Sequence, residues 1–171
     1  MIEGSSVPSR TETPLVIGVG NAARGDDAAG LRVAQDLRPL VGDRARIVDC
    51  PGNVTEILDL WEGQGRVYLI DAVRAGGVPG SWHRLLVRDQ PLPSSLAATS
   101  THGLSIASAV ALGQALGRMP DHLVVYGIEA VRFDPGADLS PEVFAGVQQV
   151  TKALVNELGR PVSGAPTPER R

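Results

Sequence analysis

Short apolar runs alternate with longer segments of helical periodicity along most of the chain. Five runs are rich in Val, Ile and Leu and are bounded by Gly, Pro or Asp, which is typical of β-strands; they cover residues 15–19, 45–48, 67–70, 83–87 and 123–126. Three of them lack polar alternation, as expected of strands that helices cover on both faces of a largely parallel sheet. The run at 83–87 follows a turn rich in Gly and Pro, so we predict an edge or antiparallel strand there.

The segments between these runs have the periodicity of amphipathic helices. Three of them cover residues 29–40, 54–61 and 104–116, and a fourth begins at Pro141 and carries apolar residues up to Leu158. Asn53 is predicted to cap the second helix and Ser140 the fourth. Alternating strands and helices predict an α/β fold, a three-layer sandwich with a five-stranded, mostly parallel twisted sheet and helices on both faces.

The composition predicts one globular domain with its own core. Of the 171 residues, 43% are hydrophobic and 20% are charged, as in ordinary soluble proteins. Residues 1–13 and 159–171 are rich in Ser, Pro, Gly and charge, so we expect a flexible N-terminal segment and a flexible C-terminal tail around a single α/β domain at 14–158. The one cysteine, Cys50, excludes an intrachain disulfide and a thiolate metal cluster.

Charge and hydropathy argue against two classes of partner. The net charge is -3 and the basic residues are scattered, which argues against nucleic acid. No window reaches the roughly 18 apolar residues that a membrane span requires, and the N-terminal stretch has no apolar signal region. We therefore expect a cytoplasmic protein with no membrane partner.

Polar residues collect where the predicted strands end. Asp26 and Asp27 lie in the loop after the first strand, Asp49 follows the second, Asp71 the third and Glu129 the fifth. Ligands of open α/β sheets bind in the crevice beyond the carboxyl ends of the strands. These positions are therefore the first candidates for a functional site.

The first loop also fits a dinucleotide-binding pattern. Gly18, Gly20 and Ala23 match Gly-x-Gly-x-x-Ala, and Asp49 has the place of a ribose-binding acid. Two carboxylates precede the next helix, however, where a pyrophosphate would have to bind. They would repel a phosphate, so the loop favours a cation.

Asp27, Asp71 and His102 form a candidate set of metal ligands. Each has an ordinary alternative role, as a capping carboxylate, a turn residue or a histidine at a helix start. Two carboxylates and an imidazole suit nickel or zinc. Three protein ligands leave open positions, so the site would either receive a metal that another molecule already holds or activate water on its own metal. The residues alone leave both possibilities open.

Four blocks of the sequence together resemble the hydrogenase maturation proteases. They are IGVGN with GDDAAGLRVA at 17–34, LIDAV with the Gly- and Pro-rich turn at 69–80, STHGL at 100–104, and GIE with LSPEV at 127–143. The chain departs from the family pattern at Ala28, at the turn 50–53 and at Ala130. None of these departures removes a candidate metal ligand.

The resemblance implies an endopeptidase that removes the C-terminal extension of a nickel-iron hydrogenase large-subunit precursor after nickel insertion. Asp27, Asp71 and His102 match the family's metal-contacting residues. Nickel would come with the substrate precursor as a recognition element, and no organic cofactor is expected. Glu129 is a candidate for orienting His102 or acting as a general base.

No catalytic nucleophile is assigned, and two other classes of function remain open. Ser100 and Ser105 lie near His102 in the sequence, but there is no Gly-x-Ser-x-Gly elbow. One alternative is a non-catalytic nickel or dinucleotide binding module. The other is a zinc-type hydrolase that carries its own metal.

Overall fold

The sheet has five strands in the order β2-β1-β3-β5-β4 in the computed structural model, which describes residues 11–87 and 106–159. Four strands run parallel: β1 (Leu15–Val19), β2 (Arg46–Cys50), β3 (Arg66–Val73) and β5 (His122–Glu129). The fifth, β4 (Trp82–Val87), pairs antiparallel with β5 at one edge. The predicted mostly parallel sheet and its antiparallel edge strand are both confirmed.

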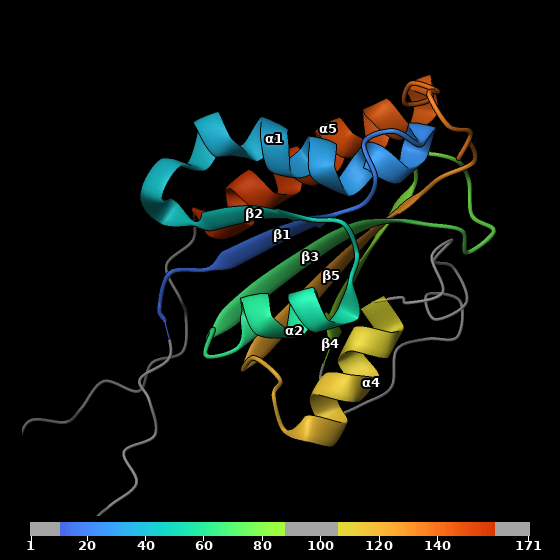
Figure 1. Ribbon diagram of the computed structural model, residues 1–171. Coiled ribbons are helices and arrows are strands. Elements are labelled where there is room, and N and C mark those ends of the chain that lie inside the picture. The colour runs from blue at the N-terminus through green and yellow to red at the C-terminus, as the bar shows by residue number, and fades with distance from the viewer. Residues whose placement is uncertain (1–10, 88–105, 160–171) are drawn as a thin grey trace, which may run out of the picture.

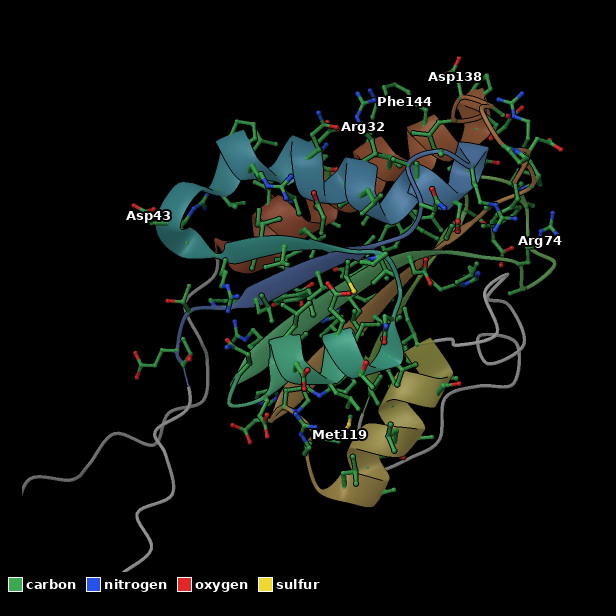
Figure 2. All side chains as sticks on the ribbon, viewed as in Figure 1. Arg32, Asp43, Arg74, Met119, Asp138 and Phe144 are labelled. Carbon is green, nitrogen blue, oxygen red and sulfur yellow. The ribbon has the colours of Figure 1, made fainter. Side chains whose placement is uncertain are left out.

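Helices cover both faces of this sheet, which confirms the predicted three-layer sandwich (Figure 1). α1 (Ala29–Val41) and α5 (Pro141–Leu158) lie side by side on one face, and α2 (Val54–Trp61) and α4 (Ile106–Leu116) lie on the other. The guanidinium of Arg32 lies 5.1 Å from the ring centroid of Phe144 and joins α1 to α5 (Figure 2). Two short 3-10 helices, η1 (Gly25–Ala28) and η2 (Gly42–Arg44), flank α1.

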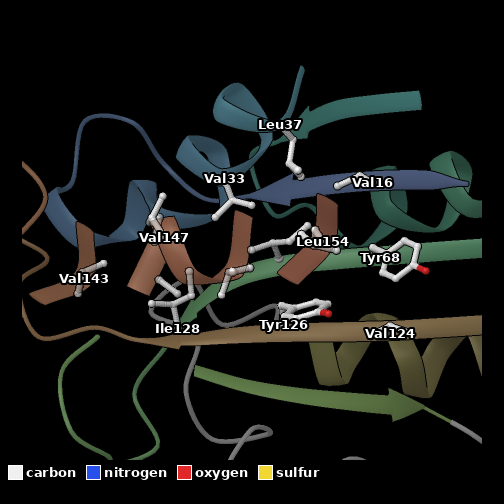
Figure 3. Packing of buried hydrophobic residues seen from close by; sticks show 14 of the residues in the cluster. Val16, Val33, Leu37, Tyr68, Val124, Tyr126, Ile128, Val143, Val147 and Leu154 are labelled. Carbon is white, nitrogen blue, oxygen red and sulfur yellow. The ribbon is translucent and has the colours of Figure 1, made fainter. Parts of the chain in front are cut away.

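Strand side chains alternate between two apolar cores, one on each face of the sheet. Figure 3 shows side chains of α1 and α5 meeting those of the strands: Val33, Leu37, Val147, Leu154, Val16, Tyr68 and Tyr126. The other core joins α2 and α4 to the opposite side chains of the same strands, among them Ile57, Trp61, Ala109, Ile17, Leu69 and Val125. Full burial of one such aliphatic side chain contributes roughly 1.5–3 kcal/mol, so the two cores hold the sheet between the helix layers.

Two glycines let the start of α1 approach the sheet very closely. A Cβ atom on Gly30 would lie 2.3 Å from the carbonyl oxygens of Val19 and Ile70, and one on Gly18 would lie 2.5 Å from the carbonyl oxygen of Gly30. Larger residues would push the helix away from β1 and β3. The close fit places η1, which precedes α1, against the carboxyl end of β3.

The predicted capping hydrogen bond is present at the start of α2 and absent at the start of α5. The Asn53 side chain accepts the N–H of Thr55 at 3.0 Å and caps α2 as predicted. Pro141 begins α5 as expected, but the side chain of Ser140 makes no capping hydrogen bond. Instead the backbone N–H of Ser140 donates to Asp26 at 2.7 Å. Ser140 thus occupies the predicted N-cap position of α5, but its side chain does not make the capping hydrogen bond.

The predicted terminal segments, 1–13 and 159–171, lie outside the described residues except for 11–13 and Gly159. Thr11 forms an isolated parallel bridge with Gln64 and donates its N–H to the carbonyl of Gly63 at 3.1 Å. Gly159 ends α5. No helix in the described part of the chain is long and apolar enough to cross a membrane.

Candidate functional site

Asp71 is a buried carboxylate inside β3, two residues before the strand ends. Its side chain is only 9% exposed, and its Oδ1 accepts the N–H of Ala72 at 2.8 Å. Burial, and next the negative charge of Asp27, raise the pKa of Asp71 to about 8. The sequence placed Asp71 after the strand, but β3 continues to Val73. Asp71 therefore projects from a rigid strand.

Asp27 lies in η1 and is buried as well, with 4% of its surface exposed. Its N–H donates to the carbonyl of Arg24 at 3.1 Å, and its own carbonyl accepts the N–H of Asn21 at 3.2 Å. Gly20 has a φ of +147°, and a Cβ atom there would lie 1.9 Å from the Asp27 carbonyl oxygen. This tight loop holds Asp27 near enough to Asp71 that the charge of Asp27 disfavours the ionised form of Asp71. The structure thus brings the two predicted acidic residues together.

The neighbouring residue, Asp26, has a different role. It is fully buried, and its carboxylate accepts the backbone N–H groups of Val131, Arg132 and Ser140 at 3.1, 2.9 and 2.7 Å. Burial alone would raise the pKa of Asp26, but these hydrogen bonds hold it below its ordinary value. Asp26 therefore ties η1 to the loop between β5 and α5.

An arginine, Arg74, also contacts the same loop. The guanidinium of Arg74 lies 4.3 Å from the ring centroid of Phe133 and is directed to the carbonyl of Val131 at 3.4 Å. Figure 2 labels Arg74 at the end of the molecule where β3 and β5 finish. The loop that donates to Asp26 is thus held by a cation–π contact in addition to its own backbone bonds.

The third predicted ligand, His102, lies outside the described residues. Its role, with those of Ser100 and Ser105, therefore stays a prediction. Within residues 11–87 and 106–159, no three His, Cys, Asp or Glu side chains are grouped so that they would hold a metal ion. Asp27 and Asp71 lie near each other in this part of the chain. The prediction would add the imidazole of His102 to them.

Glu129 ends β5 and is only 2% exposed. Its Oε2 accepts the N–H of Ala75 at 3.1 Å, and its Oε1 lies 3.3 Å from Nε2 of His83. A Cβ atom on Gly77 would lie 2.9 Å from the Cγ of Glu129, so the turn after β3 closes tightly over this carboxylate. The predicted roles of Glu129, orienting His102 or acting as a general base, stay predictions; within the described residues the histidine that contacts Glu129 is His83. Sequence reasoning did not single out His83.

The first loop is built differently from a dinucleotide-binding loop. The N–H groups of Gly20, Asn21 and Ala23 donate within the protein, to Cys50 O at 3.1 Å, Asp27 O at 3.2 Å and Asn21 Oδ1 at 2.9 Å. Asp49, the expected ribose-binding acid, lies within β2 and pairs with Arg38 at 2.8 Å. Because these groups already have protein partners, the loop geometry weighs against a bound pyrophosphate.

Cys50 lies at the end of β2 and is fully buried. Burial raises the pKa of its thiol, and the charges of Glu56 and Asp71 act in the same direction. The thiolate is the nucleophilic form of cysteine, so this environment disfavours Cys50 as a nucleophile.

Comparison with known proteins decides the family. The family model HycI, hydrogenase maturation protease, matches residues 32–157, which is well over half of the chain. The chain belongs to the hydrogenase maturation protease family. It is 31% identical over 134 residues to the hydrogenase expression/formation protein HupD of Bradyrhizobium diazoefficiens, a match that covers 75% of this chain and 69% of that protein. It is 26% identical to the hydrogenase 2 maturation protease of Escherichia coli, over 84% of this chain and 89% of that one.

The fold agrees with a solved member of the same family. The hydrogenase maturating endopeptidase HybD from Escherichia coli superposes with a TM-score of 0.72 at 25% sequence identity, over 85% of this chain and 93% of that structure. The protein is accordingly a maturation endopeptidase, a peptide hydrolase. In an open α/β sheet the carboxyl ends of the strands are the expected place for its site, and Asp27, Asp71 and Glu129 lie there.

Proposed function

We propose that this endopeptidase removes the C-terminal extension of a nickel-iron hydrogenase large-subunit precursor after nickel has been inserted. In this proposal nickel belongs to the substrate and acts as a recognition element. Family membership supports the hydrolytic part of the proposal. The observation that carries the recognition of a metal is the buried pair of Asp27 and Asp71.

Two buried carboxylates oppose each other's ionisation unless a cation lies between or beside them. Without a cation, Asp71 keeps its proton at neutral pH, because its pKa is about 8. A divalent cation favours the ionised form and displaces that proton. A precursor without nickel brings no such charge to the pair. The site would therefore bind the loaded precursor in preference to the empty one.

His102 would complete the recognition of the metal, as the family resemblance implies. Two carboxylates and one imidazole suit a borderline ion such as nickel. The remaining coordination positions would be filled by the precursor's own cysteines. We also place this reaction in the cytoplasm, where the single free cysteine of the chain stays reduced.

The test is to incubate the purified protein with a cognate precursor, nickel-loaded and nickel-free, and to measure the precursor's intact mass. We expect loss of one defined C-terminal peptide from the loaded precursor only. Asp27→Asn should abolish this cleavage. Asp49→Asn is the matched control, because this carboxylate is half exposed and pairs with Arg38 instead of Asp71.

Two outcomes would contradict the proposal. Equal cleavage of the nickel-free precursor would indicate a hydrolase that carries its own metal. Binding of nickel without any cleavage of a cognate precursor would favour a binding module.

A further inference from the structure

The pairing register places His83 in the same row of the sheet as Asp71. Asp71 of β3 pairs with Gly127 of β5, and Gly127 pairs in turn with His83 of β4. Residues directly opposite each other on neighbouring strands project to the same face. With strands roughly 4.8 Å apart, the Cα atoms of Asp71 and His83 lie about 10 Å from each other. Gly127 has no side chain, so no side chain of β5 separates them in this row.

This face is the one that α2 and α4 cover. Two residues further back along the strands, Leu69, Val125 and Leu85 occupy the corresponding row and pack in the core beneath those helices. The apolar row ends where the carboxyl edge of the parallel strands begins. Asp71 and His83 are thus the first polar side chains beyond that core on β3 and β4.

Glu129 fixes the imidazole of His83. The carboxylate is almost completely buried, while 48% of the His83 side chain is exposed. In the neutral tautomer that donates its Nε2 hydrogen to the Glu129 carboxylate, Nδ1 keeps its lone pair and can accept a proton. Glu129 is itself held by the N–H of Ala75 and by backbone hydrogen bonds of 2.8 Å with Gly80 and Ser81. The result is an accessible imidazole with a rigid orienting group.

A buried carboxylate that orients an exposed imidazole is more than an ion pair needs if it only stabilises the fold. Exposed pairs contribute roughly 0–1 kcal/mol and do not require one partner to be buried. Here the turn closes over the carboxylate so tightly that Gly77 has no room for a Cβ atom. The arrangement matches the general pattern of a base whose second nitrogen is held by a carboxylate.

We propose that His83 is the general base of peptide hydrolysis and that Glu129 is its positioning residue. Nδ1 takes a proton from water while the water oxygen bonds to the carbonyl carbon of the scissile peptide, and the C=O π electrons move to the carbonyl oxygen. These electrons then re-form the C=O bond as the C–N bond breaks. The electron pair of that bond stays on nitrogen, which takes the proton from the imidazolium. One acid and one amine result, and His83 is neutral again.

The proposal rests on the endopeptidase activity and not on nickel recognition. The assay follows cleavage of the nickel-loaded precursor by intact mass, over a range of precursor concentrations, for His83→Gln, Glu129→Gln and the double variant. His122→Gln is the matched control, because His122 is exposed at the opposite end of β5. Circular dichroism and thermal unfolding of each variant report on the fold.

We expect His83→Gln to lower kcat by about 100-fold or more with KM changed less than about 2-fold. Glu129→Gln should lower kcat by about 10-fold, and the double variant should be no slower than His83→Gln, because both residues act in one step. His122→Gln should cleave at the wild-type rate.

A wild-type kcat for His83→Gln would overturn the proposal, and so would an effect on KM alone or multiplied losses in the double variant. If His83→Gln unfolds, His83→Asn is measured in its place and judged by the same criteria. Cleavage that does not require nickel would contradict the proposed recognition of the metal. The kcat values of the histidine variants would still test the role of His83.

Discussion

We expect Asp71→Asn to make the isolated protein more stable, although it changes a residue of the proposed site. The folded chain keeps a proton on Asp71 up to about pH 8, whereas the unfolded chain releases it near the ordinary value of 3.8. Between these values the folded state binds more protons than the unfolded state. The free energy of unfolding therefore falls as the pH rises through this range.

The size of the effect follows from the same values. A tenfold change in proton affinity corresponds to about 1.4 kcal/mol, so the interval from 3.8 to pH 7 corresponds to roughly 4 kcal/mol against folding. Asparagine has no charge and still offers an oxygen to the N–H of Ala72. We expect Asp71→Asn to raise the free energy of unfolding by about 2–4 kcal/mol at pH 7, and by less at pH 5.

Urea unfolding of wild type and variant at pH 5, 6, 7 and 8 measures this difference directly. Asp49→Asn serves as the control, because its carboxylate is half exposed and its contribution should stay below about 1 kcal/mol at every pH. A variant that is no more stable than wild type at pH 8, or a difference in the free energy of unfolding that does not grow with pH, would refute this reasoning. Either result would show that folding does not raise the pKa of Asp71.

Two further predictions concern how the site is held. Asp26→Asn should lower the free energy of unfolding by about 2–4 kcal/mol at pH 7 in urea unfolding, because an amide cannot accept all three N–H groups that reach this carboxylate. Folding lowers the pKa of Asp26, so the full loss of stability should be seen above about pH 4 and should shrink as the wild-type carboxyl protonates at lower pH. A variant as stable as wild type at pH 7 would refute the role of Asp26 as an acceptor of these hydrogen bonds. Gly30→Ala should cost more than about 3 kcal/mol or prevent folding, because its Cβ would lie 2.3 Å from two carbonyl oxygens, and a soluble, cooperatively unfolding variant of wild-type stability would contradict the close approach of α1.

The sheet could be predicted because apolar periodicity reports burial. Runs of branched residues marked all five strands, and the Gly- and Pro-rich turn correctly marked β4 as the antiparallel edge. The predicted ends of β3 and β5 come too early, because Asp71 and Gly127 are residues of the types that usually bound strands. Asp71 and Glu129 both lie within strands instead, since each finds hydrogen bonds there.

The partner of Glu129 could not be predicted from the sequence, because register is a property of pairs of strands. His83 stands in a short strand without strong alternation, 46 residues from Glu129. Only the joint register of β3, β5 and β4 places it opposite Gly127 and in the row of Asp71. A reading of strand ends finds residues that follow strands, and it misses a residue near the start of an antiparallel one.

Asp26 and Asp27 show why adjacent residues of one type can have opposite functions. Sequence reasoning treated them as a pair that attracts a cation. Within the same 3-10 helix their surroundings differ: Asp26 accepts three backbone N–H groups, and Asp27 lies near Asp71. The N–H donors stabilise the ionised form of Asp26, whereas burial and the charge of Asp27 oppose the ionisation of Asp71. Asp26, fixed by its hydrogen bonds, thus supplies rigidity where Asp27 lies near Asp71, and a cation arriving at this pair would favour the ionised form of Asp71 and displace its proton.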